Sequence, residues 1–309
     1  MNGPVIKAAP NAFCKDDILR AELLSRFPQA VFNDSGTRLA GDSLIEFLAD
    51  ADGAIIGLEK IDGAILDACP KLRIVAKFGV GLNNLDIEAM SDRGVRLGWT
   101  SGVNRRSVSE MTLGFMLGLT HNLYISDRQM RAGTWLRNGG RQLSQCTVGI
   151  VGFGHIGRDL AALLRPLGCR LLINDILPMR TEIAAAGGKP VSFDELIAES
   201  DIVTIHTPLT SKTRGLISVP VLRAMKEDAI LINTARGEIV VEADLKRALK
   251  EGWIGAAALD VYNTEPVTDR ELLDLPNTAF TPHIGGNTRE AVLAMGQSAI
   301  AHLQDFFEV

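Results

Sequence analysis

Short apolar runs alternate with amphipathic segments along the whole chain. The runs are continuously apolar, which is typical of strands in a parallel sheet covered on both faces. The segments between them carry apolar residues on one face, as helices packed on such a sheet do. The expected strands are 5–6, 30–32, 54–56, 74–76, 95–97, 148–151, 171–173, 202–205, 230–232 and 256–259, and the expected helices include 158–167, 193–199, 219–225 and 242–251. This alternation predicts an α/β fold.

The first five strands and the last five are expected to form separate sheets, giving two doubly wound parallel-sheet domains. Residues 107–131 lie between them and carry apolar side chains on most helical turns. Ser107 and Glu110 have the spacing of a capping box, which predicts that a helix begins there. This helix either belongs to the core of one domain or packs against the other domain or a second copy of the chain.

Composition fits a globular protein of two domains. The chain has 309 residues, of which 46% are apolar and 22% charged. Its net charge of −5 gives no reason to expect nucleic-acid binding. The longest apolar run, 111–119, is too short to span a bilayer, and no secretory signal begins the chain. The four cysteines form no Cys-x-x-Cys pair, so we expect a cytoplasmic protein without a metal site.

One glycine pattern predicts dinucleotide binding. Gly152, Gly154 and Gly157 follow an apolar strand directly and precede a helical stretch, with the spacing G-x-G-x-x-G. The first glycine permits a tight turn, the second lets a pyrophosphate approach the backbone, and the third lets helix and strand pack closely. The N–H groups of His155 and Ile156 would bind the pyrophosphate at the helix N-terminus.

The next strand ends at an acidic residue. Asp175 lies 18 positions after Gly157, where a carboxylate can accept hydrogen bonds from the adenosine ribose and repel a 2′-phosphate. This favours NAD over NADP; the alternative is a solvated carboxylate after a glycine-rich turn. Ligands of open α/β sheets bind beyond the carboxyl ends of the strands. That rule adds these coenzyme-binding candidates: His206, Thr207, Thr234, Ala235 and Asp260.

Several segments together resemble one known family. They are 77–86, the glycine loop 152–157, 205–209, 232–237, 259–266 and 281–285. In these segments the chain is similar to the D-isomer-specific 2-hydroxyacid dehydrogenases, most of all to the D-3-phosphoglycerate dehydrogenase branch, and the similarity covers essentially the whole chain. The resemblance implies a homodimer in which a Rossmann NAD-binding domain, 103–281, is inserted into a flavodoxin-like catalytic domain formed by 1–102 and 282–309.

The resemblance also implies three catalytic residues. Oxidation of a secondary alcohol needs a base that titrates near neutrality, and His283 matches the catalytic histidine of the family. Glu265 matches the carboxylate that orients this imidazole and stabilises its charged form. Arg236 follows a buried strand, and its forked donors suit the carboxylate and carbonyl of a 2-oxo acid.

Further contacts follow from the same resemblance. Asp260 is expected to bind the nicotinamide carboxamide, and Gly286 is a further coenzyme contact. The backbone N–H groups of Gly79, Val80 and Gly81 are expected to bind the substrate carboxylate, and Lys60 is a candidate substrate contact.

The substrate stays open at this point. The phosphoglycerate branch carries an Arg-Ser pair where this chain has 57–60, so phosphoglycerate is in doubt. Lys60, Arg105 and Arg106 either bind a second anionic group, such as a phosphate, phosphonate or carboxylate, or are solvated. The alternatives are a glyoxylate or hydroxypyruvate reductase and an NADH-sensing, corepressor-like binding protein. Glu265 disfavours formate dehydrogenase, where the resemblance implies Gln. Because the chain ends at Val309, no regulatory domain is expected.

Overall fold

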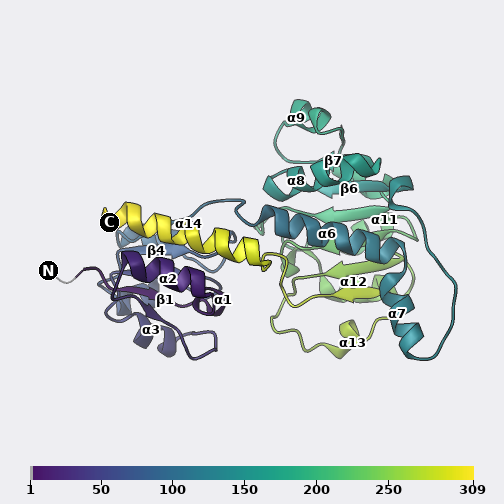
Figure 1. Ribbon diagram of the computed structural model, residues 1–309. Helices are drawn as coiled ribbons and strands as arrows, with labels where there is room; N and C mark the ends of the chain where they lie inside the picture. The colour runs from purple at the N-terminus through teal and green to yellow at the C-terminus, as the bar shows by residue number, and fades with distance from the viewer. Residues whose placement is uncertain (1–2) are drawn as a thin grey trace. The chain divides into compact units, whose positions relative to one another are not determined.

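The fold consists of two compact units. The computed structural model describes residues 3–309. The first unit comprises residues 3–104 together with Gly286–Val309, and the second unit comprises Arg105–Gly285. Figure 1 shows the two units, with both ends of the chain in the same one. The second unit is therefore an insertion in the first.

The first unit is built on a five-stranded parallel sheet with the order β2-β1-β3-β4-β5. Its strands are β1 Ile6–Ala8, β2 Val31–Phe32, β3 Gly53–Ile56, β4 Ile74–Lys77 and β5 Arg96–Gly98. Its helices are α1 Asn11–Cys14, α2 Asp17–Arg26, α3 Asp42–Leu48, α4 Gly63–Ala68, α5 Ile87–Asp92 and α14 Arg289–Phe307. The chain leaves β1 toward β2 on one side and returns to β3 on the other, so the order reverses between β1 and β3.

Both faces of this sheet are buried. Neighbouring residues of one strand enter different cores: Ile55 packs with α1, α2 and α14, whereas Ala54 and Ile56 pack with α3 and α4. Continuous apolar strands therefore fit their two-sided burial. Figure 1 shows α14, from the carboxyl end of the chain, alongside α2 from near the amino end.

The second unit is built on a seven-stranded parallel sheet with the order β12-β11-β10-β9-β6-β7-β8. Its strands are β6 Thr147–Val151, β7 Arg170–Asn174, β8 Lys189–Pro190, β9 Ile202–Ile205, β10 Ile230–Asn233, β11 Ala256–Leu259 and β12 Thr278–Phe280. Its helices are α6 Arg105–Thr120, α7 Leu123–Arg131, α8 His155–Leu164, α9 Arg180–Ala185, α10 Phe193–Glu199, α11 Val219–Ala224, α12 Glu242–Lys250 and α13 Arg270–Leu273, with short 3₁₀ turns at Leu143–Gln145, Arg165–Leu167 and Gly237–Ile239.

The strand order of this unit is that of a Rossmann fold. The chain passes from β6 to β7 and β8 on one side, then crosses to β9 and β10 on the other, so the order reverses between β6 and β9. Two cores cover the sheet: Ile202 packs with residues of α6 and α8, whereas Val203 packs with residues of α10, α11 and α12. The predicted class, two doubly wound parallel sheets with a Rossmann unit inserted, is confirmed.

Ten of the strands lie where the apolar runs predict them, and the differences have physical reasons. The predicted capping box is wrong: α6 begins at Arg105, and the buried Ser107 hydroxyl donates to the carbonyl of Gly285. The predicted continuous helix over 107–131 ends at Thr120, and α7 starts after Asn122, whose φ of +56° is left-handed. Phe115 and Met116 place α6 in the core of the second unit.

The second unit begins and ends a few residues away from the predicted domain limits. Residues 103–104 cluster with the first unit, and 282–285 cluster with the second. Residues 282–285 belong to the second unit because the Asp260 carboxylate accepts hydrogen bonds from the backbone N–H groups of Ile284 and Gly285. These bonds keep His283 in the second unit. None of the helices between residues 3 and 309 is both long and apolar enough to cross a membrane.

Candidate active site

The glycine loop lies at the carboxyl end of β6, beside the point where the strand order reverses. Gly152 has a φ of +98°, and a Cβ there would lie 2.8 Å from the carbonyl oxygen of His206. A Cβ on Gly157 would lie 2.1 Å from the carbonyl oxygen of Gly152. A Cβ on Gly154 would meet nothing within 4 Å, so space is open beside its backbone. The three glycines thus provide a turn, close packing and room for a ligand.

The helix that follows the loop begins without a side-chain cap. Gly154 is the N-cap of α8, and His155 is its first residue. The first N–H groups of a helix have no acceptor within the helix and carry the positive end of its dipole. An anionic group such as a pyrophosphate is the ligand that these N–H groups bind most favourably.

Asp175, the predicted ribose-binding residue, also fixes the glycine loop. One carboxylate oxygen accepts a hydrogen bond from the N–H of Phe153, within the glycine loop, at 2.6 Å. The other accepts from the N–H of Leu177 at 2.9 Å. Each oxygen keeps further lone pairs for ribose hydroxyls, and the negative charge opposes a 2′-phosphate.

Two polar side chains at the end of β9 have buried atoms without a partner among the described residues. They are Nδ1 of His206 and the hydroxyl of Thr207. Nε2 of His206 lies 2.9 Å from the Thr204 hydroxyl, and desolvation lowers the pKa of this imidazole to about 3. Buried polar atoms usually find partners, so these two atoms fit a polar ligand at the strand ends. Together with the open space at Gly154, they fit NAD.

Arg236 follows β10 and is mostly enclosed. Burial lowers the pKa of this guanidinium, whereas the nearby negative charges of Glu265 and Glu238 raise it. One of its terminal nitrogens donates to the carbonyl of Ala235 at 2.6 Å. The Asn233 side chain fixes the turn, because its amide donates to the Arg236 carbonyl and its oxygen accepts from Ala235 N–H. A partly desolvated guanidinium at the carboxyl end of a strand is suited to an anionic ligand.

Glu265 and His283 form a hydrogen-bonded pair across 18 residues of sequence. Nδ1 of His283 lies 2.8 Å from Oε2 of Glu265. Burial acts to raise the pKa of Glu265, but the hydrogen bond and charge of His283, the Tyr262 N–H and the Arg236 charge lower it below its usual value of 4.5. Glu265 is therefore a carboxylate at neutral pH, and it binds the Nδ1 edge of the imidazole ring.

Asp260 holds the His283 loop. Its Oδ1 accepts from the Thr281 hydroxyl at 2.6 Å and from Ile284 N–H at 2.8 Å. Its Oδ2 accepts from Gly285 N–H at 2.9 Å. His283 itself has a φ of +54°, a left-handed conformation that is unfavourable for a residue with a Cβ. Asp260 thus braces a strained backbone at the candidate catalytic histidine, in addition to the nicotinamide contact that the sequence predicts.

Sequence reasoning missed two residues that support this site. Tyr262 donates its backbone N–H to Oε1 of Glu265 at 3.2 Å and its hydroxyl to the carbonyl of Thr281 at 2.9 Å. Thr281 binds Asp260 through its own hydroxyl. Both lie inside the segments 259–266 and 281–285 that carry the resemblance, so their position in these segments was the available signal.

The second unit brings together most of the predicted site residues. Gly152–Gly157, Asp175, His206, Thr207, Thr234, Ala235, Arg236, Asp260, Glu265 and His283 all belong to it. Gly286, Lys60, Gly79, Val80 and Gly81 belong to the first unit. Gly79 has a φ of +129°, and in the described part of the chain the N–H groups of residues 79–81 have no protein acceptor. Lys60 is 74% exposed and lies 2.9 Å from Asp62.

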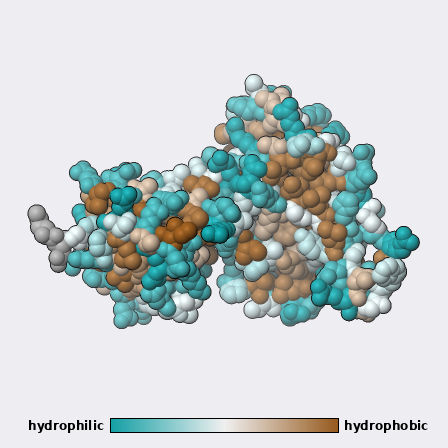
Figure 2. All heavy atoms as spheres, in the orientation of Figure 1, coloured by the Kyte–Doolittle hydropathy of each residue, from teal (hydrophilic) through white to brown (hydrophobic). Residues whose placement is uncertain are grey.

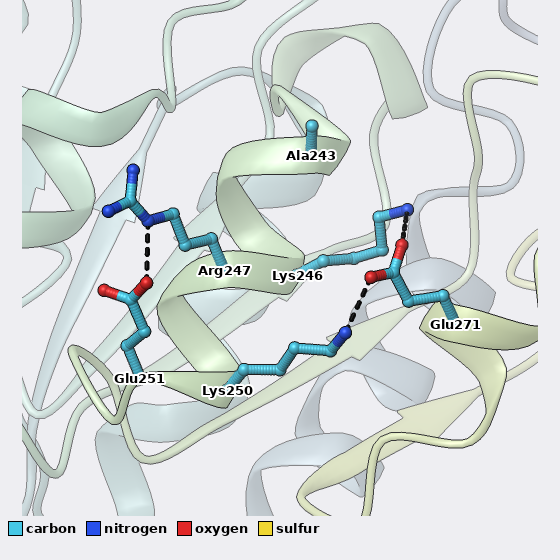
Figure 3. Close-up of a pocket in the computed structure, with 6 residues that line it drawn as sticks. All are labelled: Ala243, Lys246, Arg247, Lys250, Glu251 and Glu271. Carbon is cyan, nitrogen blue, oxygen red and sulfur yellow. Dashed lines mark hydrogen bonds and ion pairs between the residues drawn. The ribbon is translucent and has the colours of Figure 1, made fainter.

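A hollow of about 330 Å³ on α12 is a weaker candidate for a binding site (Figure 3). Glu271 lies 2.6 Å from the ammonium nitrogens of both Lys246 and Lys250. Arg247 lies 2.8 Å from Glu251. Its cations are thus neutralised by carboxylates of the same chain, and the hollow offers no uncompensated charge to a ligand.

The geometry of the second unit defines a class of protein: a dinucleotide-binding oxidoreductase with an arginine, a glutamate and a histidine at the sheet edge. The family model described as D-isomer specific 2-hydroxyacid dehydrogenase, NAD binding domain, matches residues 113–285. A glyoxylate reductase of Thermococcus litoralis is 34% identical over 273 residues, covering 85% of this chain and 82% of the relative. The chain belongs to the D-isomer specific 2-hydroxyacid dehydrogenase family. It is an NAD-dependent enzyme of that family.

Two further similarities bear on substrate and fold. A D-3-phosphoglycerate dehydrogenase of Archaeoglobus fulgidus is 36% identical over 264 residues, covering 84% of this chain. This chain spans 50% of that relative's length. The crystal structure of a glyoxylate reductase from Paecilomyes thermophila superposes with a TM-score of 0.86 at 26% identity, covering 100% of this chain and 96% of the other.

Proposed function

We propose that this enzyme reduces a small 2-oxo acid to its D-2-hydroxy acid, and catalyses the reverse reaction, with Arg236, Glu265 and His283 as catalytic residues. The observation that carries the proposal is the 2.8 Å pair between His283 Nδ1 and the Glu265 carboxylate. Arg236 lies close enough to Glu265 for the carboxylate to raise the pKa of its guanidinium. A base, its orienting acid and a cation are the groups that this reaction needs.

The three catalytic residues have distinct roles in the reduction. NADH, when bound, would supply a hydride to C2 of the 2-oxo acid. His283 donates the proton that the carbonyl oxygen takes up, so that C=O becomes CH–OH. Because Nδ1 is bound to Glu265, Nε2 is the nitrogen that exchanges this proton. Glu265 stabilises the protonated ring, and Arg236 binds the carboxylate and polarises the carbonyl.

The second unit contributes the proposed coenzyme contacts. The N–H groups of the α8 terminus bind the pyrophosphate, Asp175 binds the ribose and selects NAD, and the residues at the ends of β9, β10 and β11 line the remaining coenzyme site. These contacts are Gly152, Gly154, His155, Ile156, Gly157, Asp175, His206, Thr207, Thr234, Ala235 and Asp260, with Gly286 from the first unit. The uncapped α8 terminus and the partnerless atoms of His206 and Thr207 support this assignment.

The first unit contributes the proposed substrate contacts. The N–H groups of Gly79, Val80 and Gly81 bind the substrate carboxylate, which their lack of a protein acceptor in the described chain supports. The names of the relatives suggest glyoxylate and 3-phosphoglycerate as models. We favour a glyoxylate- or hydroxypyruvate-like substrate, because Lys60 already lies 2.9 Å from Asp62, and Arg106 lies 2.8 Å from Asp159. Arg105 stays a predicted contact for a second anionic group.

The test is NADH oxidation by the purified protein over a panel of 2-oxo acids that includes glyoxylate, hydroxypyruvate and 3-phosphohydroxypyruvate. His283→Ala should lower kcat by roughly 10²–10⁴-fold, the usual contribution of a general acid, while NADH binding stays unchanged. The exposed His121 provides a matched control, and His121→Ala should keep wild-type activity. An NADH-sensing binding protein would bind NADH yet oxidise it with no member of the panel.

We propose that the enzyme is a homodimer associating through the second unit. Exposed apolar side chains support this, among them Leu123 at 56% and Met130 at 53% exposure on α7, and Trp135 at 74% beyond it. Figure 2 shows apolar side chains gathered on the face of the second unit where α6 and α8 lie in Figure 1. A cytoplasmic location stays a prediction from the sequence.

A further inference from the structure

The strand order of the first unit also reverses at one point. Open parallel sheets bind ligands beyond the carboxyl ends of their strands, at the point where the strand order reverses. In the first unit this point lies between β1 and β3. The chain that follows β1 there contains Pro10, and the chain that follows β3 contains Gly57 and Glu59.

The Glu59 side chain places a carboxylate beside the end of β3. Its side chain is buried, with 3% exposure, and its Oε2 accepts a hydrogen bond from the N–H of Gly57 at 2.7 Å. A Cβ built on Gly57 would lie 3.1 Å from Pro10 and 3.5 Å from the same oxygen. The carboxylate therefore lies beside the end of β3, at Gly57, and Gly57 also lies close to Pro10, which follows β1. A free N–H at a strand end is a group that binds anions, and here Glu59 already occupies it.

A buried lysine fixes the Glu59 loop next to the proposed substrate turn. Lys77 ends β4 with 4% exposure and donates to the carbonyl of Gly57 and, at 2.8 Å, to the side-chain oxygen of Asn84. The Asn84 amide donates to the carbonyls of Gly57 and Glu59. Residues 79–81 follow Lys77 after one intervening residue, and a Cβ on Gly79 would lie 3.7 Å from the Lys77 side chain. This network joins the loop after β3 to the turn after β4.

We propose that Glu59 is a specificity-determining residue that restricts the enzyme to 2-oxo acids whose only anionic group is the reacting carboxylate. The inference rests on the proposed function, in which the turn at residues 79–81 binds that carboxylate. A substrate held there with a phosphate or second carboxylate brings another negative charge toward the ends of β3 and β4. A buried carboxylate disfavours such a group, since neither charge is fully solvated. Glu59 also offsets the charge of Lys77, the buried cation of the same network, and Lys60 is paired with Asp62.

Hydroxypyruvate and 3-phosphohydroxypyruvate test this, because they differ only by the phosphate on C3. The wild-type enzyme should show a kcat/KM for hydroxypyruvate at least about tenfold above that for the phosphate ester, which corresponds to about 1.4 kcal/mol. Glu59→Gln keeps size and an oxygen acceptor for Gly57 N–H but removes the charge. It should raise kcat/KM for the ester about tenfold, chiefly by lowering KM, and leave hydroxypyruvate nearly unchanged. Glu46→Gln, at an exposed carboxylate of the same unit, should change neither.

Two results overturn the proposal: a wild-type preference for the phosphate ester, or a Glu59→Gln variant that folds and shows the wild-type ratio of the two kcat/KM values. Thermal melting and NADH binding report whether the variant is folded. If it is not, calorimetric binding of D-glycerate and 3-phospho-D-glycerate to the wild-type NAD complex decides, and tighter binding of the phosphate ester contradicts the proposal. Failure to oxidise NADH with any 2-oxo acid contradicts the proposed function instead, and the same binding comparison still tests Glu59.

Discussion

At the scale of single residues, the site depends on a histidine held in an unfavourable backbone conformation. The left-handed φ of His283 is stabilised by one carboxylate, Asp260, which is 1% exposed and binds the chain on both sides of the histidine. Burial raises the pKa of Asp260, whereas the Thr281, Ile284 and Gly285 donors lower it by less. The energy stored at the strained residue is thus offset by hydrogen bonds that form only in the folded loop.

Replacing Asp260 tests whether this residue supports the His283 loop or binds the coenzyme. In Asp260→Asn, one oxygen acceptor becomes an NH₂ donor that opposes an N–H group of Ile284 or Gly285. The histidine loop should shift, and kcat should fall about 10- to 100-fold, as small misplacements of a catalytic group do. NADH affinity, measured by fluorescence titration, should change less than kcat. A large loss of NADH affinity with kcat retained at saturating NADH would show that Asp260 acts on the nicotinamide alone.

The proposed role of Glu265 predicts a change in the pH range of the reaction. Its pKa lies below 4.5, so the carboxylate remains charged throughout the neutral range and stabilises the protonated His283 ring. In Glu265→Gln the negative charge beside the ring is lost. We expect the alkaline limb of the kcat/KM profile for reduction, recorded from about pH 5 to about pH 9, to move to lower pH. An unmoved limb would mean that Glu265 serves structure only, a role that the melting temperature would report.

At the scale of elements, the glycine loop was predictable because its geometry admits few residues. The positive φ of Gly152 and the 2.1 Å approach at Gly157 exclude side chains, so backbone geometry appears directly in the sequence. The short strands β8 and β12 were not predictable. Each lies at an edge of the sheet, and β8 contains Pro190, which lacks the N–H that a central strand requires. The break at Asn122 also lacks a glycine or proline to mark it.

The strand end at Asp175 should decide between the two coenzymes. Asp175→Asn retains an oxygen acceptor for the Phe153 N–H in the glycine loop but removes the charge that opposes a 2′-phosphate. The ratio of kcat/KM with NADPH to that with NADH should rise about tenfold. The 2′-phosphate of NADPH is no longer repelled, and the ribose of NADH loses its charged acceptor. Asp194→Asn, at an exposed carboxylate on α10, is the matched control and should leave the ratio unchanged. An unchanged ratio in the Asp175 variant would place the selectivity elsewhere.

At the scale of the whole molecule, the insertion of one unit in another was predictable only from the resemblance. Apolar periodicity indicates two sheets but not that residues 286–309 pack with the amino-terminal part of the chain. That arrangement depends on contacts between distant segments, such as Ala299 and Ile300 of α14 packing in the core of the first sheet. The candidate catalytic residues were likewise predicted by motif, whereas the 2.8 Å pairing of His283 with Glu265 comes from the structure alone.

The exposed apolar surface of the second unit argues for a dimer of the whole chain. None of the α7 side chains is buried, yet Leu123 and Met130 are apolar, and a hollow of about 390 Å³ beside α7 is lined by Leu123, Tyr124 and Phe280. Large apolar side chains that are exposed close together often mark a protein–protein interface, and a stable interface buries about 800 Å² on each partner.

Sedimentation velocity should therefore show a dimer of the 33.3 kDa chain at micromolar concentration. Leu123→Glu with Met130→Glu should convert it to a folded monomer, because two charges would have to be buried without partners in the interface. Ile18→Glu introduces the same charge at an apolar residue of the first unit that is 49% exposed, and should leave the dimer intact. A monomeric wild type would refute association through the second unit. A double variant that stays dimeric would show that the interface does not include α7.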